Sequence, residues 1–559
     1  MVRLVLSGAD DADLIALSAG FGRDGPGVLT DDGLAAAYRW TTRDGREALA
    51  RGETGGLTVD LSDQPSGRAD LLRLDHAEDG VLRIEAERPS IRLARLAAED
   101  PPGAAFDPIL NGADRFEVSG RGDARLFGDA LSAAAQDRGR GDLFQLEGAG
   151  GRQATGDFWL IPSTAFQVRG GADDFQVASR GALHLWGDAA MALDKAGYDG
   201  ALIRGGDDRL DAGAALSGVR RPETPVMVGD VGAVGVGWLL RGGDDLLIAP
   251  RGAGAAMSGD VLTGDGQSRL VCGDDLLRGG RGRDLLIGDA QDLLEPLVRI
   301  RPGDDALRGG RGNDALHGDA RFAAPETVVL GRDAGADRLF GGEGRDRAWG
   351  GWSDDRIFGG DDGDRLHGDA GADRIEGGAD ADRLWGGAGA DRLAGGAAAD
   401  RLFGGGGRDA ARGGGGGDVV AGGGGDDLIE GNDGRDRLRG DLGRDRLVGG
   451  AGDDDLRGGA GKDRLAGGGG DDRLDGGAGA DRLLGGAGAD LFRLAAGGGR
   501  DRVEDFDPAE DGLWLPRGAE PLQVAETARG VSVELAGAEL MLLGVTLDAL
   551  EDAGQSWLV

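Results

Sequence analysis

The sequence predicts an all-β fold: a parallel β-roll (β-solenoid) of nonapeptide repeats with β-rich N- and C-terminal caps. Three observations lead to this prediction. Eighteen aspartates follow one another at nine-residue steps from Asp337 to Asp490 without a change of phase. An apolar residue stands two positions after each of them, and glycine-rich stretches separate the units. A short fixed period of this kind is typical of a stacked repeat architecture.

Each unit divides into a turn half and a strand half. In residues 386–394 the glycines suit a tight turn, because glycine adopts positive φ and lets neighbouring backbones approach closely. The half after Asp391 is predicted as a three-residue strand with Leu393 pointing inward. Alternation then turns Arg392 and Ala394 outward. Two units make one 18-residue turn of the roll, with a short strand on each side.

The inward positions form an apolar column without exception. The column reads Leu339, Ala348, Ile357, Leu366, Ile375, Leu384, Leu393, Leu402, Ala411, Val420, Ile429, Leu438, Leu447, Leu456, Leu465, Leu474, Leu483 and Phe492. Only one residue in nine contributes to this core. Its burial must offset the conformational entropy lost when a glycine-rich backbone becomes ordered, and so thin a core needs a further source of stability. The alternative is a disordered low-complexity segment, but the coincidence of period, column and acidic row favours the roll.

Calcium is the predicted stabiliser of these turns. The 18-residue turn sorts the aspartates into two rows whose carboxylates stack about 4.8 Å apart. Like charges at that spacing repel one another, whereas a Ca²⁺ ion between them takes roughly six to eight hard oxygen ligands, so the rows permit about sixteen sites. Fewer strong sites are expected, because Ser353, Asp362, Asp380 and Ala398 replace a loop glycine.

The predicted Ca²⁺ ligands are the aspartates of the regular repeats and four from earlier, nearly complete units. They are Asp337, Asp346, Asp355, Asp364, Asp373, Asp382, Asp391, Asp400, Asp409, Asp418, Asp427, Asp436, Asp445, Asp454, Asp463, Asp472, Asp481 and Asp490, with Asp275, Asp284, Asp305 and Asp314.

The charge and the apolar content of the chain limit the classes of molecule that it is expected to bind. The formal net charge of −37 disfavours nucleic acid and anionic lipid and attracts divalent cations. No apolar segment approaches the roughly 18 residues of a membrane span, so membrane insertion is not expected. The N-terminus carries no recognisable signal peptide. Cys272 is the only cysteine, which precludes an intramolecular disulfide.

The repeats and the segment after them resemble the RTX (repeats-in-toxin, hemolysin-type calcium-binding) proteins. The C-terminal stretch, with strands predicted at 531–535 and 539–543 and an acidic-then-apolar ending at 551–559, is similar to that of serralysin-type exoproteins. The resemblance implies a secreted, extracellular or cell-surface protein. It implies export by a type I secretion ABC transporter without a signal peptide, and folding outside on calcium. It also implies that the aspartate rows supply side-chain ligands and the glycine loops carbonyl ligands.

Four segments are predicted. Residues 1–105 form a β-rich cap or small domain, with short strands near 57–61, 70–74 and 80–84. Residues 106–331 continue the roll as degenerate repeats interrupted by insertions, which solenoids accommodate as loops on one face. Residues 332–494 are the regular roll, and residues 495–559 are a β cap that carries the secretion signal.

The outward arginines have two readings. Arginine follows the aspartate in most repeats, as at Arg338, Arg365, Arg383, Arg401, Arg446 and Arg482. Pairing with neighbouring acids on a mixed solvated face is favoured over a stripe for polyanions.

No catalytic residues are predicted. The sequence has no H-E-x-x-H zinc motif and no G-x-S-x-G nucleophile elbow. His317 and His367 are expected on the surface, and Cys272 as a small packed residue. A non-catalytic surface, adhesion or matrix protein is the favoured function, with a cell-surface or polysaccharide partner. A carbohydrate-active exoenzyme stays open, because paired carboxylates occur throughout the chain. A cytolysin is a further alternative, although the chain lacks the long apolar amphipathic region that the family's pore-formers carry.

Overall fold

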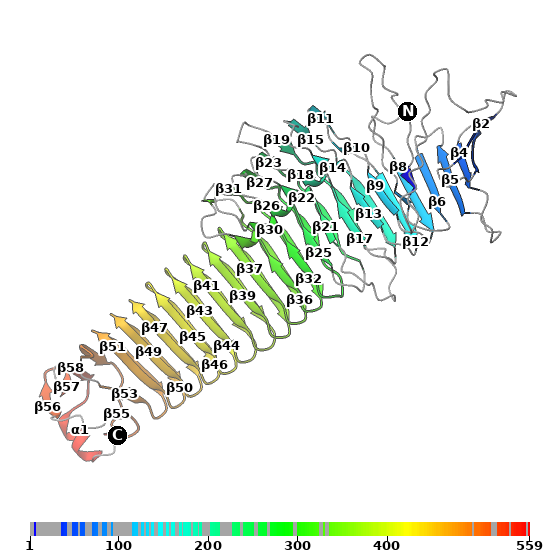
Figure 1. The fold of residues 1–559 in the computed structure, drawn as a ribbon. Coiled ribbons are helices and arrows are strands. Elements are labelled where there is room, and N and C mark those ends of the chain that lie inside the picture. Colours follow the sequence, from blue (N-terminus) through cyan, green and yellow to red (C-terminus); the bar gives the residue numbers. More distant parts are fainter. Residues whose placement is uncertain are drawn as a thin grey trace. The chain divides into compact units, whose positions relative to one another are not determined.

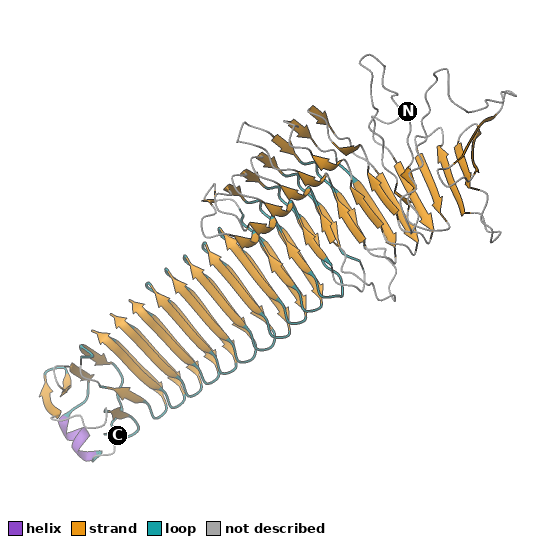
Figure 2. Cartoon of the chain, in the orientation of Figure 1, coloured by secondary structure: helices purple, strands orange, loops and turns teal. Residues whose placement is uncertain are grey.

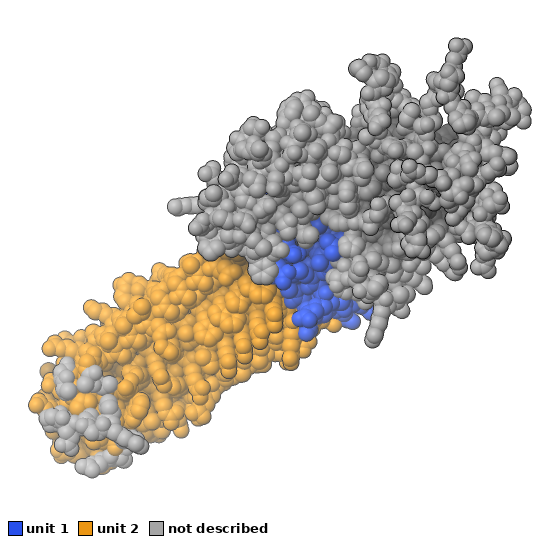
Figure 3. Space-filling view, viewed as in Figure 1, with its two compact units in different colours: residues 1–334 blue, residues 335–559 orange. Residues whose placement is uncertain are grey.

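The computed structural model describes side chains at residues 205–212, 226–231, 240–250, 255–261, 270–291 and 300–321, and at 335–558 with gaps at 495–496, 516–522, 536–537 and 555–556. It also describes side chains at a few positions between 172 and 187, and strand backbone at further positions towards the N-terminus. The chain divides into two compact units, residues 1–334 and residues 335–559 (Figure 3).

The second unit is a parallel β-roll with an 18-residue turn. Each strand pairs in parallel with the strand two further along the chain, as Leu384 of one turn does with Leu402 of the next. Two sheets result, and consecutive strands alternate between them (Figure 1). One sheet holds β37 (Arg347–Trp352), β39 (Arg365–Ala370), β41 (Arg383–Ala388), β43 (Arg401–Gly406), β45 (Val419–Gly424), β47 (Arg437–Gly443), β49 (Asp455–Gly461), β51 (Arg473–Gly479), β53 (Leu491–Arg493) and β55 (Gly512–Trp514). The other holds β36 (Arg338–Glu343), β38 (Arg356–Asp361), β40 (Arg374–Gly378), β42 (Arg392–Gly396), β44 (Ala410–Gly415), β46 (Leu428–Asp433), β48 (Arg446–Ala451), β50 (Arg464–Gly469), β52 (Arg482–Ala487) and β54 (Arg500–Val503).

The predicted inward column is the core of this roll. All of its members, from Leu339 to Phe492, are buried. The strands are longer than the predicted three residues, however, and most span six. In β41 the burial alternates through Leu384 and Gly386, so the strand continues into the glycine pair. Glycine here extends the sheet rather than ending it, because its backbone keeps the ladder hydrogen bonds at φ values that other residues avoid.

The C-terminal cap begins where the repeat ends. β58 (Ala538–Leu543) adds to β54 in parallel, and β57 (Gly530–Leu535) and β56 (Leu522–Thr527) follow antiparallel. The predicted strand pair at 531–535 and 539–543 is thereby confirmed. A helix that the sequence did not suggest, α1 (Leu547–Asp552), follows and is N-capped by the Thr546 side chain (Figure 2). Strands of the cap cover the last turn of the roll, which leaves fewer open backbone groups at that edge.

The first unit is built from longer coils with four strands each. The strands of two of its sheets include many that directly follow a repeat aspartate. They are β8 (Arg115–Gly120), β12 (Leu143–Gly148), β16 (Asp174–Ser179), β20 (Arg209–Asp211), β24 (Leu246–Ile248), β28 (Leu276–Arg278) and β32 (Ala306–Arg311), and then β1 (Val5–Leu6), β7 (Ile91–Arg92), β9 (Ala124–Phe127), β13 (Arg152–Thr155), β17 (Leu183–Trp186), β21 (Val226–Val228), β25 (Ala256–Ser258), β29 (Leu285–Ile287) and β33 (Ala315–His317).

The insertions predicted as loops contain strands instead. They stack into two further parallel sheets (Figure 1). One holds β10 (Ala130–Ser132), β14 (Phe158–Ile161), β18 (Ala189–Ala192), β22 (Val231–Val234), β26 (Val261–Gly264), β30 (Ala290–Leu293) and β34 (Ala320–Ala323). The other holds β11 (Gln136–Arg138), β15 (Gln167–Arg169), β19 (Leu202–Arg204), β23 (Leu239–Arg241), β27 (Arg269–Val271), β31 (Arg299–Arg301) and β35 (Val328–Val329). Successive insertions pair with one another because each places a short strand at the same point of its coil, and most of these strands contain apolar residues.

Antiparallel strands precede these coils. They are β2 (Ala35–Thr41), β3 (Glu47–Glu53), β4 (Gly56–Leu61), β5 (Asp70–His76) and β6 (Val81–Ala86). Each pairs with the next, and β6 joins β8 in parallel. Strands were expected near 57–61, 70–74 and 80–84, and β4, β5 and β6 lie there. The four predicted segment boundaries themselves stay a prediction.

Candidate metal centre

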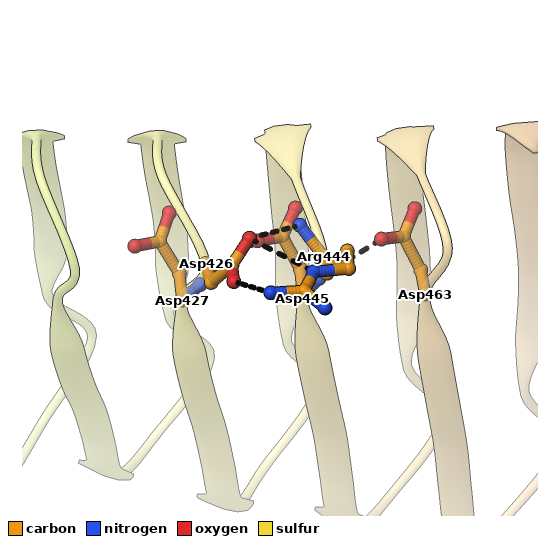
Figure 4. Close-up of polar contacts among 5 residues, drawn as sticks. All are labelled: Asp426, Asp427, Arg444, Asp445 and Asp463. Carbon is orange, nitrogen blue, oxygen red and sulfur yellow. Dashed lines mark hydrogen bonds and ion pairs between the residues drawn. The ribbon is translucent and has the colours of Figure 1, made fainter.

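Two rows of buried aspartates run along the second unit, one beside each sheet. In both rows the backbone N–H of each aspartate donates to Oδ1 of the aspartate 18 residues later, at 2.7–3.0 Å from Asp337 to Asp490. Figure 4 shows three members of one row, Asp427, Asp445 and Asp463, with their carboxylates aligned from strand to strand. All eighteen of these side chains are buried. The structure therefore brings together every repeat aspartate that the sequence singled out.

The second carboxylate oxygen of these aspartates, Oδ2, takes no part in the hydrogen bonds along the rows. From Asp355 to Asp490, every Oδ2 in the rows is buried and has no hydrogen-bond partner. A buried carboxylate oxygen without a partner is expensive, because its charge is removed from water without compensation. Burial, reinforced by neighbouring aspartates, raises the pKa of Asp355 to about 8 and that of Asp373 to about 7. The rows thus need either protons or a cation.

A glycine lies against each of these oxygens, and in most repeats a second glycine follows it. A Cβ placed on Gly386 would sit 2.4 Å from Oδ2 of Asp391, so the first glycine makes room for the carboxylate. The second, Gly387, has φ +115°, and a Cβ there would meet the Asp369 carbonyl oxygen at 2.0 Å. The nonapeptide needs its two glycines for two different reasons: the first admits a charged group, and the second takes a conformation that L side chains rarely adopt.

Several loops hold other residues in the same conformation. Ser353, Asp362, Asp380 and Ala398, which replace a loop glycine, have φ values of 96°, 70°, 65° and 71°. The left-handed backbone costs an L-residue roughly 1–2 kcal/mol, somewhat less for aspartate. The turns therefore persist where glycine is missing, at the expense of local strain.

The family comparison bears on this arrangement. The family model for the RTX calcium-binding nonapeptide repeat matches residues 273–292 and 301–320 and, in overlapping copies, 333–503. This chain is an RTX repeat protein. No curated protein matches it. Among solved structures, the AlgE6R3 subunit of the Azotobacter vinelandii mannuronan C5-epimerase is 33% identical, with 20% of this chain and 76% of that one covered and a TM-score of 0.17. Extracellular lipase LipA from Serratia marcescens is 20% identical, with 32% and 40% covered and a TM-score of 0.17.

The donors of the RTX rows suit calcium. They are carboxylate oxygens with backbone carbonyls nearby, as the Gly404 carbonyl oxygen is to Gly386, and such hard oxygen ligands are those that Ca²⁺ prefers. Residues Asp355 to Asp490 would hold the ions through the oxygens that lack hydrogen bonds. Bound there, Ca²⁺ would supply charge neutralisation that the thin apolar core cannot.

The four earlier predicted ligands lie in comparable rows of the first unit. The Asp275 N–H donates to Asp305 Oδ1 at 2.7 Å, and the Asp284 N–H to Asp314 Oδ1 at 2.8 Å. The first of these rows extends back through Asp245 and Asp208, whose steps are 30 and 37 residues. The RTX registers therefore survive although the coil is longer.

The rows also extend past the last predicted member. The Asp481 N–H donates to Asp501 Oδ1 and the Asp490 N–H to Asp511 Oδ1, each at 3.0 Å. The steps are 20 and 21 residues, which hides these aspartates from a nine-residue search. Their local sequences still hold the signal, because a buried apolar residue stands two positions after each: Val503 in β54 and Leu513 in β55.

A further set of buried aspartates escaped the sequence prediction. Asp230, Asp260 and Asp289 are 0% exposed and stand immediately before β22, β26 and β30. The sequence signal is a Gly-Asp pair followed by valine or alanine, as at Gly259-Asp260-Val261. Because the insertions were expected to be loops, this pair was not recognised as the start of a strand.

The expected pairing of outward arginines holds only in part. Arg374, which follows Asp373, pairs with Glu376 at 2.5 Å. Arg444, which precedes a repeat aspartate, pairs with Asp426 at 2.5 Å (Figure 4). The six arginines named from the sequence are exposed, and within the described residues none of them forms an ion pair. Most of them lie beside arginines of adjacent turns, as Arg383 lies beside Arg365 and Arg401. The parallel register places equivalent residues of successive turns side by side. The sequence period implies this arrangement, but the prediction considered only pairs of opposite charge.

The two outward histidines are not ordinary surface residues. His317 is buried, and burial lowers the pKa of this residue to about 3. His367 stacks between Trp349 and Trp385 at 5.8 and 4.2 Å, and Phe403 continues the column. The same side-by-side register produces this column. Each ring face is covered by the next ring, so the column stabilises the sheet and offers solvent mainly ring edges.

Proposed function

We propose that this RTX protein folds on extracellular Ca²⁺ and acts as a non-catalytic surface, adhesion or matrix component. The observation that carries the proposal is the continuous series of buried Oδ2 atoms without hydrogen-bond partners, from Asp355 to Asp490. A chain that serves only as a scaffold has no reason to bury so many charges. Burying these carboxylates is explained if calcium, which is abundant outside the cell, neutralises them and completes the core.

The proposed ligands are the eighteen repeat aspartates with Asp275, Asp284, Asp305 and Asp314. In the cytosol, where calcium is scarce, carboxylates within each acidic row would repel one another and keep the second unit open. This behaviour suits passage of an unfolded chain through a type I ABC transporter, with residues 495–559 as the segment read by the exporter. Among the described residues, no helix is long and apolar enough to cross a membrane.

The test is a calcium titration of the purified full chain. Far-UV circular dichroism and light scattering would be followed from a calcium-free state to about 10 mM Ca²⁺, well above the 10⁻⁴–10⁻³ M typical of extracellular modules. Magnesium serves as the control, because it binds reluctantly where octahedral geometry is not offered. A calcium-specific gain of β signal with compaction is expected. A chain fully folded at neutral pH without calcium would overturn the proposal.

A further inference from the structure

One position of the first unit changes chemistry from coil to coil. It follows the strands β19, β23, β27 and β31, which lie in one parallel sheet. The residues there are Gly205, Gly242, Cys272 and Pro302. At Gly242 a Cβ would lie 1.5 Å from Asp260 Oδ1 and 2.7 Å from Asp230 Oδ2. The position is therefore flanked by two carboxylates, and one coil places the chain's single thiol in it.

The carboxylates around Cys272 come from Asp260 and Asp289. Both are 0% exposed and begin adjacent strands of the insertion sheet, β26 and β30. The Gly273 N–H contacts both oxygens of Asp260 at 3.2 Å, and the Gly303 N–H donates to Asp289 Oδ1 at 3.0 Å. Asp289 Oδ2 is buried and has no hydrogen-bond partner. The backbone thus orients two acids toward one thiol and leaves an acceptor oxygen unused.

The three groups are close enough to share one ion. Ligand atoms from Asp260, Cys272 and Asp289 all lie within 4.8 Å of one another. A second cluster in the same unit, formed by Asp208, Asp230 and Asp245, offers oxygen donors alone within the same limit, and it includes two members of an RTX row. Oxygen donors alone favour Ca²⁺ or Mg²⁺, whereas a thiolate with carboxylates favours Zn²⁺ and related ions that accept sulfur.

We propose that Cys272 Sγ, Asp260 and Asp289 form a binding site for a thiophilic divalent cation of the zinc class, separate from the calcium rows. Asp260 and Asp289 belong to neither RTX row, since one row in this region consists of Asp245, Asp275 and Asp305 and the other of Asp284 and Asp314. The site would fix β26, β27 and β30 to one another. It would give the chain a second metal dependence that calcium cannot replace, because calcium binds sulfur poorly.

The experiment uses Cd²⁺ as a spectroscopic probe on the calcium-loaded full chain under a non-thiol reductant. Thiolate coordination gives an ultraviolet charge-transfer absorption that calcium sites cannot produce. We expect saturation at about one equivalent of Cd²⁺ and loss of the band on adding Zn²⁺. Cys272→Gly, which copies Gly242 of the neighbouring coil, and Asp289→Asn should both abolish it. Asp274→Asn, at an exposed aspartate two residues from Cys272, should leave it unchanged.

A second measurement protects the test against misfolded variants. In the wild-type chain, Zn²⁺ should slow modification of the Cys272 thiol by a thiol reagent at least tenfold, while Mg²⁺ should not. Calcium-loaded circular dichroism would establish that Cys272→Gly keeps the fold. The proposal is overturned if no charge-transfer band forms with the wild-type chain, if the band survives in a folded Asp289→Asn variant, or if Zn²⁺ leaves the thiol reactivity unchanged.

Discussion

The two units arrange aspartates in the same way around different cores. In residues 335–503 each 18-residue turn buries two apolar side chains, such as Leu384 and Leu393, against two aspartates. In residues 205–321 each coil buries apolar side chains from four strands. The coil that begins at Asp245 contributes Leu247, Met257, Val261 and Leu270. The longer coil therefore surrounds its acids with about twice as many large apolar side chains.

This difference separates two functions that the repeat aspartate could have. Where the core is thin, neutralising the carboxylates decides whether the turn forms, because little apolar burial opposes chain entropy. Where the core is thicker, the same row adds to a structure that has other support. We infer that the second unit depends on calcium for folding, and that the first unit depends on it less. The predictions below test this contrast, from the largest expected effect to the smallest.

Protonation of the buried aspartates at low pH should stabilise the fold of the second unit in the absence of calcium. Burial raises the pKa of Asp355 to about 8, of Asp373 to about 7 and of Asp445 to about 6. The folded, ion-free chain therefore holds protons that the unfolded chain releases near pH 4. This stabilisation is fully present below that pH and is lost progressively as the pH rises above it, until the loss is complete above about 8.

Circular dichroism of resin-stripped protein should show β signal at pH 5 that falls by pH 8, and calcium should restore it at pH 8. The first unit should account for the signal that survives at pH 8. A calcium-free chain whose β signal is the same at both values would contradict this explanation of the rows.

Replacing two neighbours of one row should remove calcium sites from that row alone. Asp391 and Asp409 are consecutive members, linked by a 2.9 Å hydrogen bond. The double substitution Asp391→Asn with Asp409→Asn removes two charges that flank shared gaps, so bound calcium should fall while the other row stays filled. Equilibrium dialysis would count the ions. Asp426→Asn, next to a row member but only half-buried, is the matched control. Unchanged stoichiometry in the double variant would refute the two-row arrangement.

Substituting alanine for glycine should destabilise the protein at positions with positive φ and a close backbone contact, and should have little effect at positions with open space. Gly387→Ala places a Cβ at φ +115° and 2.0 Å from a carbonyl oxygen, so calcium-loaded stability should fall by about 1–3 kcal/mol. Gly406→Ala has nothing within 4 Å of its Cβ and should change stability by less than about 1 kcal/mol. Thermal unfolding in calcium measures both. Equal losses would mean that the loops of the second unit tolerate or reject side chains without regard to the geometry described above.

The exposed ion pair should have the smallest effect. Arg444 and Asp426 bond at 2.5 Å across adjacent turns of the second unit, but both are solvated. Arg444→Ala should leave the calcium midpoint and the thermal midpoint unchanged, because surface pairs contribute little. A clear shift in either midpoint would show that surface charge, and not the buried rows alone, supports the thin-core turns.

The sequence predicted what its period determines. The nine-residue step predicted the two aspartate rows from Asp337 to Asp490, the buried column from Leu339 to Phe492 and the 18-residue register of strand pairing. Each of these follows from the alternation of side chains along a strand and from the stacking of turns. It did not predict that strands continue through Gly386, because the need for that glycine arises from a carboxylate five residues later in the chain that folds against it. The His367 stack and the arginine neighbours likewise appear only when like positions of successive turns are laid side by side.

The remaining surprises come from places where the period breaks. Asp501 and Asp511 keep the rows at steps of 20 and 21 residues, and a fixed-period search passes over them. Asp260 and Asp289 begin strands inside insertions, where short valine and alanine stretches carry too little pattern to predict pairing. Those strands form because neighbouring coils offer them an edge, which is a tertiary effect that no single coil encodes.

The most direct measurement is hydrogen exchange of the full chain at neutral pH, resolved by mass spectrometry into peptides, with and without calcium. Backbone amides of residues 338–494 should be strongly protected with calcium and should exchange rapidly without it, whereas those of residues 205–321 should keep much of their protection. Loss of protection in both regions together would contradict the contrast between a thin and a thick core. Full protection of residues 338–494 without calcium would contradict the account of the aspartate rows as cation sites.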